Sequence, residues 1–241
     1  MRGLILAVQF LTRIPTPQID DFQESEFSAC AIWFPAVGLL LGALLVAAAM
    51  LGLHAHLWMA ALLVLLFWVA LTGGLHIDGA ADLADALGAG HANPERFQAV
   101  MKDPHLGVFG VLTLVMICLT KLVAVAVLLQ QETTHIWALL LIPAWARLGS
   151  MIWSQNLPPL AAGRGERFAW QLSQRQVWLW CLVLFIATVV LLSFVFALQA
   201  CIVIALWYFY LKWRLGGMSG DCLGAGIEYS ECAMLLALVL L

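Results

Sequence analysis

Residues Leu106–Gln130 read LGVFGVLTLVMICLTKLVAVAVLLQ, an apolar run that contains a single charge, Lys121. A helix needs about 20 mostly apolar residues to cross the hydrocarbon core of a bilayer, so this run is long enough to span it. The whole chain of 241 residues has the same character, with 64% hydrophobic residues, 10% charged residues and a mean hydropathy of +0.99. A soluble domain carries about 25% charged residues, so the composition excludes a soluble globular protein.

Six further runs meet the same criterion, some of them marginally: 29–53, 57–75, 135–153, 177–197, 199–214 and 222–241. The sequence therefore predicts an all-α polytopic membrane bundle with seven transmembrane helices, forming a single membrane-embedded domain over residues 1–241. No charge or turn residue separates the runs 177–197 and 199–214, so a count of six spans stays open. Residues Met1–Thr12 are too short to cross and are predicted to form an amphipathic helix on the membrane surface.

The basic residues predict the orientation of the chain. With the N-terminus in the cytoplasm, nine of the eleven Lys and Arg residues fall on the inner side: Arg2, Arg13, Arg96, Lys102, Arg164, Arg167, Arg175, Lys212 and Arg214. The outer turns contain none, which agrees with the positive-inside rule. The net charge of −3 and the absence of a polybasic face exclude a nucleic-acid partner. The six cysteines show no metal-ligand spacing and are predicted to be packing residues.

The stretch Thr72–Asp85 reads TGGLHIDGAADLAD and carries three acids, Asp78, Asp82 and Asp85, at positions i, i+4 and i+7. At 3.6 residues per turn these side chains share one face of a helix. Carboxylates stacked at a membrane boundary repel one another, and hard divalent cations prefer oxygen ligands. The spacing predicts a site for Mg²⁺ or Mn²⁺, with Gly79 leaving room for a bulky ligand. The alternative is a solvated loop, and His76 is either part of the site or structural.

The stretch Met101–Gly110 reads MKDPHLGVFG and places Lys102 and Asp103 directly before a span. A lysine can pair with phosphate, and a carboxylate can bind a metal ion or accept a proton. Gly107 and Gly110 permit close approach of a backbone or a ligand, and the helix N-terminus that follows attracts anions. A Lys-Asp pair beside the membrane can equally be a solvated feature.

The stretch Gly216–Glu231 reads GGMSGDCLGAGIEYSE. Asp221 is either a functional acid or the N-cap of the following helix. Glu228 and Glu231 lie within an apolar span, where ionisable groups are costly and usually face a cavity or a partner. The cations Lys121 and Arg147 also lie within spans, so we expect them to pair with these glutamates or with an anionic substrate. Arg164, Arg167 and Arg175 of the inner loop are predicted to be positive-inside anchors, and the alternative is that this loop closes over a phosphate.

Acids and cations thus gather at the cytoplasmic ends of several spans, which favours phosphoryl chemistry. An ion-coupled carrier is the competing class. Its site is expected near the bilayer midplane, between repeated halves of the chain. The sequence shows no repeat, and its densest acidic cluster lies at one membrane surface. An enzyme is therefore the preferred interpretation.

These stretches, together with QFLTRIPTP (Gln9–Pro17) and WFPAVGLLLG (Trp33–Gly42), resemble the cobalamin synthase family from end to end. Members of this family are adenosylcobinamide-GDP ribazoletransferases of the bacterial inner membrane. The resemblance implies a Mg²⁺-dependent transfer of adenosylcobinamide phosphate from adenosylcobinamide-GDP to α-ribazole or its 5′-phosphate, with release of GMP. It implies metal ligation by Asp78, Asp82 and Asp85 and catalytic roles for Lys102, Asp103 and Asp221. The oligomeric state is left open, a homo-oligomer included.

The chain departs from the family pattern at two places. Pro104 and His105 stand where the family usually has Ser-Arg, so phosphate binding by His105 requires its protonated form. Ser219 stands where the family usually has Thr. The runner-up is a membrane alcohol phosphotransferase of phospholipid head-group synthesis. Its usual signature has an Ala-Arg pair after the Asp-Gly and wider gaps between the aspartates.

Overall fold

The computed structural model describes residues 2–19, 21, 23, 26, 29–90, 97, 99–101, 103, 105–131, 133–160 and 172–240. Every regular element within this part of the chain is helical. The elements are α1 (Arg2–Leu11), η1 (Ala31–Trp33), α3 (Phe34–Leu53), α4 (Leu57–Thr72), α5 (Leu75–Ala89), α7 (Val108–Gln130), η2 (Thr133–Ile136), α8 (Trp137–Asn156), α10 (Gln174–Leu191), α11 (Phe194–Arg214) and α12 (Gly220–Leu240). The all-α expectation is confirmed.

Five helices are long and apolar enough to cross a membrane: Ala31–Leu53, Val108–Gln130, Gln174–Leu191, Phe194–Arg214 and Gly220–Leu240. The pair α4 and α5 adds a sixth if the two helices count as one bent span. The expected spans 177–197 and 199–214 are separate helices, because Ser193 caps α11 by accepting a hydrogen bond from the Phe196 amide at 3.0 Å. The hydroxyl of Ser193 is the boundary signal that the apolar pattern hides.

Helix α8 forms the centre of the bundle and lies outside this set of candidate spans, although 135–153 is predicted as one. Most of its residues are buried, and it packs against α3, α12, α10 and α11. Its tightest neighbour is α3, where a Cβ added to Gly38 would lie 2.5 Å from the Ala144 α-carbon. Small residues permit this close backbone approach between helices in a membrane. Because neighbours surround α8, it tolerates Arg147 and Pro143.

A sharp corner separates α4 from α5, whose axes differ by 85°. Gly73 and Gly74 make the turn with φ angles of +62° and +73°, in the left-handed region that favours glycine. The expected span 57–75 therefore ends early, at Thr72. The second helix of the pair begins at Leu75 and carries the three aspartates of the TGGLHIDGAADLAD stretch.

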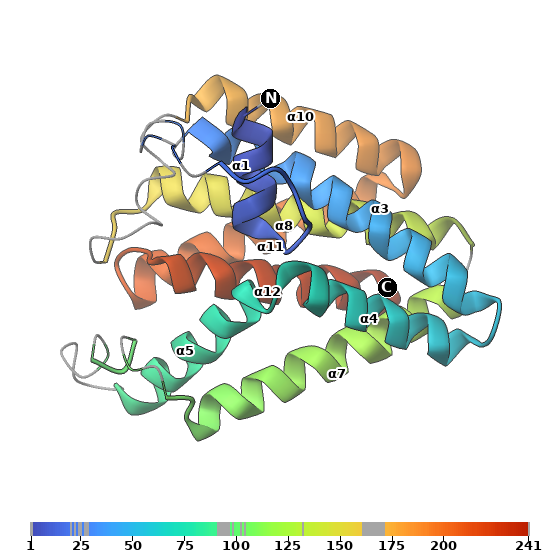
Figure 1. The fold of residues 1–241 in the computed structure, drawn as a ribbon, viewed down its shortest axis with the longest axis horizontal. Coiled ribbons are helices and arrows are strands. Elements are labelled where there is room, and N and C mark those ends of the chain that lie inside the picture. The colour runs from blue at the N-terminus through green and yellow to red at the C-terminus, as the bar shows by residue number, and fades with distance from the viewer. Residues whose placement is uncertain are drawn as a thin grey trace.

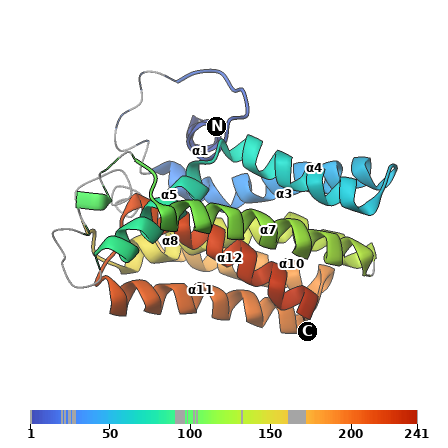
Figure 2. The same ribbon diagram turned by 90° about the horizontal axis from the view of Figure 1, so that it is seen from below.

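The helices of the bundle run side by side, so that alternate connections gather at one end (Figure 1). The C-terminal ends of α5, α8 and α11 meet the N-terminal ends of α7, α10 and α12 at that end. Helix α1 lies across α3, burying Leu6, Ala7, Val8 and Leu11. Figure 2 shows α1 and the segment after it on one face of the bundle, close to the end of α4.

Candidate active site

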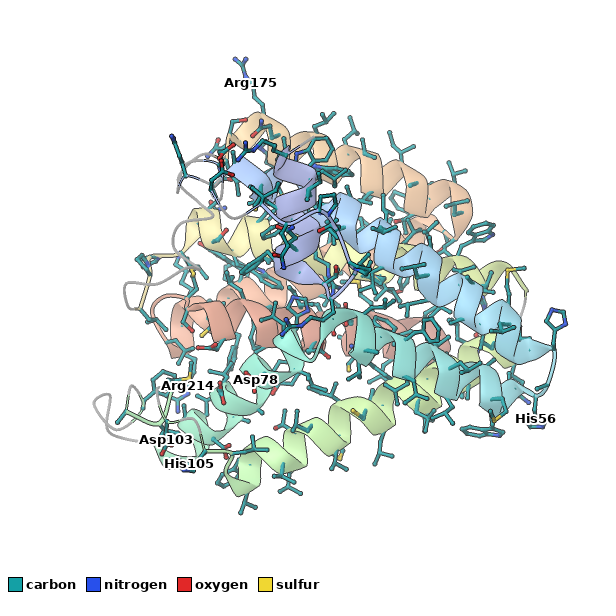
Figure 3. All side chains as sticks on the ribbon, viewed as in Figure 1. His56, Asp78, Asp103, His105, Arg175 and Arg214 are labelled. Atoms are coloured by element: carbon teal, nitrogen blue, oxygen red, sulfur yellow. The ribbon has the colours of Figure 1, made fainter. Side chains whose placement is uncertain are left out.

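The three acids of α5 differ in exposure along the helix. Asp78 is exposed, Asp82 is half-buried, and Asp85 is buried with 8% of its surface accessible. They follow one another on the face predicted from their spacing. Figure 3 places Asp78 on the side of the molecule where Asp103, His105 and Arg214 lie, away from His56 at the opposite end. Asp78 therefore lies toward the end of the bundle where the charged connections gather.

Asp221 joins this group from the first turn of α12. Helix α12 crosses α5 so closely that a Cβ added to Gly79 would lie 2.9 Å from the Asp221 α-carbon. A Cβ on Gly224 would likewise lie 3.2 Å from the His76 carbonyl oxygen. The charge of Asp82 consequently interacts with the charges of Asp78, Asp221 and Asp85. Two helices far apart in sequence thus build one acidic cluster.

This crossing corrects the expectation for Gly79. The sequence predicts that its small size leaves room for a bulky ligand, whereas the backbone of α12 fills that space. The sequence also offers Asp221 as a possible N-cap of α12, but a different residue caps this helix. Ser219 caps α12, because its hydroxyl oxygen accepts a hydrogen bond from the Cys222 amide at 3.2 Å. The carboxylate of Asp221 is therefore not used as the cap and stays available to the acidic cluster.

Asp85 caps the N-terminus of α7, in addition to any role in metal binding. Its Oδ2 accepts a hydrogen bond from the Gly107 amide at 2.7 Å, and its Oδ1 accepts one from the Gly110 amide at 2.9 Å. The N-terminus of α7 thus binds an anion, as its sequence predicts, and the anion is a side chain of α5. A Cβ on either glycine would collide with this carboxylate, which explains both glycines.

Replacing Asp85 with alanine is expected to lower the free energy of unfolding by about 2 kcal/mol, because two amides lose a charged acceptor. Thermal unfolding in detergent measures the effect. The control is Asp78→Ala, which removes an exposed acid from the same helix. Equal unfolding temperatures for the two variants would show that the contact does not stabilise α7.

Asp103 lies outside the helices and is paired locally. Its Oδ1 accepts a hydrogen bond from the His105 amide at 3.0 Å and lies 2.6 Å from the His105 ring Nδ1. These contacts, the amide bond first, lower the pKa of Asp103. Its partner in the sequence prediction, Lys102, is outside the described residues, as are Pro104, Arg164 and Arg167.

A buried ion network lies deeper in the bundle and joins α7, α8 and α12. The Lys121 Nζ donates to Glu228 Oε2 at 2.8 Å and to Glu231 Oε2 at 2.5 Å. The Arg147 guanidinium donates to Glu231 Oε1, and its Nη2 lies 3.3 Å from the His76 ring Nδ1. All five residues are buried, with at most 3% of the surface of each accessible. The expectation that the intramembrane cations pair with the glutamates is confirmed.

His76 belongs to this network and so has the structural role that the sequence left open. Its contact with Arg147 ties the first turn of α5 to the central helix α8. Within the described part of the chain, no three His, Cys, Asp or Glu side chains are placed to hold one metal ion. Metal ligation by Asp78, Asp82 and Asp85 therefore stays a prediction. The six cysteines are free thiols; Cys30, Cys222 and Cys232 are buried as expected of packing residues, Cys118 and Cys181 are half-buried, and Cys201 is exposed.

Comparison with known proteins extends over nearly the whole chain. Residues 3–239 match the family model described as cobalamin-5-phosphate synthase. The chain is 48% identical over 237 residues to the adenosylcobinamide-GDP ribazoletransferase of Thiobacillus denitrificans, covering 98% of this chain and 94% of the relative. It is 50% identical over 249 residues to that of Laribacter hongkongensis, covering 99% and 97%. No solved structure matches the chain.

Proposed function

Because the chain belongs to the cobalamin-5-phosphate synthase family, we propose that it is an adenosylcobinamide-GDP ribazoletransferase, the enzyme of the final step of B12 assembly. A ribose hydroxyl of α-ribazole, or of α-ribazole 5′-phosphate, attacks the cobinamide-linked phosphorus of adenosylcobinamide-GDP. A new phosphodiester forms and GMP leaves. The match of the family model to residues 3–239 is the observation that supports this proposal most directly.

The acidic cluster fits a divalent metal ion in the chemistry of its side chains. Asp78, Asp82 and Asp221 offer carboxylate oxygens, the ligands that Mg²⁺ prefers. Asp85 is also proposed as a ligand, through lone pairs that its two amide hydrogen bonds leave unused. When bound, Mg²⁺ supplies positive charge to the diphosphate and its leaving group. The role proposed for the protein itself is to hold four carboxylates on two crossing helices and to bring the substrate to them.

Asp221 is the better candidate for accepting the proton of the attacking hydroxyl. The hydrogen bonds from His105 stabilise the charged form of Asp103 and lower its pKa, so this carboxylate takes up a proton less readily. Asp221 lies beside Asp78 and Asp82, where the substrate is proposed to bind. Asp103 then serves as a further metal or substrate contact, and Lys102 pairs with phosphate.

We place the protein in the bacterial inner membrane with its N-terminus and acidic cluster on the cytoplasmic side. Arg175 begins α10, while Lys212 and Arg214 end α11. These helix ends lie at the end of the bundle where α5 ends and α7 begins (Figure 1). Basic residues are concentrated in cytoplasmic segments, so this distribution supports the orientation.

Membranes containing the chain are expected to release GMP from adenosylcobinamide-GDP when α-ribazole and Mg²⁺ are present. Chelation with EDTA is expected to stop the release, and added Mg²⁺ to restore it, because the carboxylates alone leave the diphosphate charge uncompensated. Chromatographic detection of GMP and of the corrinoid product measures both effects. Uptake of labelled corrinoid into vesicles without GMP release would contradict the proposal and indicate a carrier.

A further inference from the structure

The segment after α1 packs onto the corner between α4 and α5. The Arg13 amide donates a hydrogen bond to the Leu71 carbonyl oxygen at 2.6 Å. A Cβ added to Gly73 would lie 2.6 Å from Arg13 Cγ and would collide with Nε. The side chain of Arg13 therefore lies directly over the Gly73 α-carbon. Gly73 therefore has two roles: its left-handed backbone makes the turn, and its lack of a side chain leaves space for Arg13.

Arg13 also lines a cavity of about 320 Å³, which is formed by residues between Gln9 and Ile19. Its polar lining residues are Arg13, Gln9 of α1, and Thr12, Thr16 and Gln18 of the segment after α1; the apolar ones are Ile14, Pro15 and Ile19. Two of these polar groups are already used, because Gln9 Nε2 donates to the Pro17 carbonyl oxygen and Thr12 Oγ1 donates to that of Val8. The Thr16 hydroxyl is enclosed and has no hydrogen-bond partner within the described residues.

The charge of Arg13 is not neutralised by the described part of the chain. Its guanidinium makes no ion pair or hydrogen bond there, whereas Arg2 pairs with Asp21 and Glu26 and the Arg147 side chain pairs with Glu231. A guanidinium and an unused hydroxyl on residues that line one cavity form a donor set for an anion of tetrahedral geometry, phosphate above all. The cavity therefore has the chemistry of a phosphate-binding site.

Through its contact with Gly73, Arg13 lies next to the start of α5, the helix that bears three acids of the acidic cluster. Asp78 is one turn into α5, and its amide donates to the Gly74 carbonyl oxygen at 2.9 Å. With a rise of 1.5 Å per residue, Asp78 lies about 6 Å along the helix axis from Gly74. One diphosphate ester can thus place one phosphoryl group by Arg13 and another by the aspartates.

We propose that Arg13 and this cavity bind a phosphoryl group of the nucleotide substrate, a nucleoside diphosphate ester. This inference rests on the proposed function and adds to it a cationic subsite on the N-terminal segment. The acids hold the metal side of the diphosphate, and Arg13 neutralises the phosphate on the other side. The proposal also gives a function to the QFLTRIPTP stretch. Neither the proposed metal ligands nor the proposed proton acceptor belongs to this stretch.

The test compares Arg13→Met, Arg13→Lys and the control Arg2→Gln in the purified full chain. Methionine keeps an apolar stem over Gly73 and removes the charge, so its unfolding temperature reports packing separately from ligand binding. We expect Arg13→Met to raise the KM for the nucleotide substrate and to weaken GMP binding, each about tenfold or more. The KM for α-ribazole is expected to stay unchanged. Arg13→Lys is expected to recover part of the loss, and Arg2→Gln to behave as the parent chain.

Unchanged nucleotide KM and GMP affinity in Arg13→Met would overturn the subsite. A parent chain that binds GMP but performs no transfer would overturn the proposed function alone, because GMP binding is measured without turnover. Vesicles of phosphatidylcholine and of phosphatidylglycerol separate the two sources of phosphate. An effect of Arg13→Met seen equally in both supports the nucleotide, whereas an effect confined to phosphatidylglycerol assigns the cavity to a lipid headgroup and overturns the proposal.

Discussion

The Asp82→Asn variant is expected to release GMP at least about 100-fold more slowly than the parent chain. Asp82 is half-buried, and its charge interacts with those of Asp78, Asp85 and Asp221. Asparagine keeps the size of the side chain and removes the negative charge from the cluster that is proposed to hold a divalent cation. Initial rates of GMP release over a titration of Mg²⁺ measure the effect, with the amount of protein in the membrane determined in parallel.

The control for this variant is Asp21→Asn, which removes an exposed acid that pairs with Arg2 on the N-terminal segment. It is expected to leave both turnover and its Mg²⁺ dependence unchanged. The unfolding temperature of Asp82→Asn is expected to stay close to that of the parent, in contrast to Asp85→Ala. Turnover near the parent level at limiting Mg²⁺ would rule out a metal role for Asp82.

The second large effect is expected in stability, from Glu231→Gln. Glu231 accepts from both Lys121 and Arg147, and its side chain is fully buried. Removing one partner of a buried ion pair leaves uncompensated charge and typically costs about 3–5 kcal/mol. We expect a loss of that order, seen as a lower unfolding temperature and less monodisperse protein after extraction in detergent.

Two further variants test whether uncompensated charge causes the loss of stability in Glu231→Gln. Glu228→Gln removes an acid that accepts from Lys121, so its loss of stability is expected to be smaller. The double variant with Arg147→Gln and Glu231→Gln removes one charge of each sign and is expected to recover part of the loss. If Glu231→Gln folds as the parent does and yet loses catalysis, the network is not structural.

Much of the fold follows from the sequence because hydropathy and helix length are local properties. The run that begins at Leu106 forms α7, starting at Val108, and the N-terminal amphipathic helix is present as Arg2–Leu11. The pairing of Lys121 and Arg147 with Glu228 and Glu231 also follows, since charges inside spans must find one another.

The remaining features depend on which helices touch. The sequence does not distinguish Asp85 from Asp78 and Asp82, which lie on the same face of α5. Only the contact between α5 and α7 shows that Asp85 caps the N-terminus of α7. The central position of α8 also depends on packing. In the sequence it is indicated only by Arg147 and Pro143, which are unusual residues within an apolar run. The role of Gly79 depends on α12, which lies far along the chain.

The buried ion network has a consequence for biosynthesis. Lys121 and Arg147 are translated well before Glu228 and Glu231, which belong to α12. A cation at the centre of an inserting helix costs about 2.5–3.5 kcal/mol until a counter-charge reaches it. A nascent chain that has not yet emerged beyond α11 thus holds two uncompensated positive charges. Arrival of α12 neutralises both together, so lateral release of α7 and α8 into lipid is expected only after α12 has been synthesised.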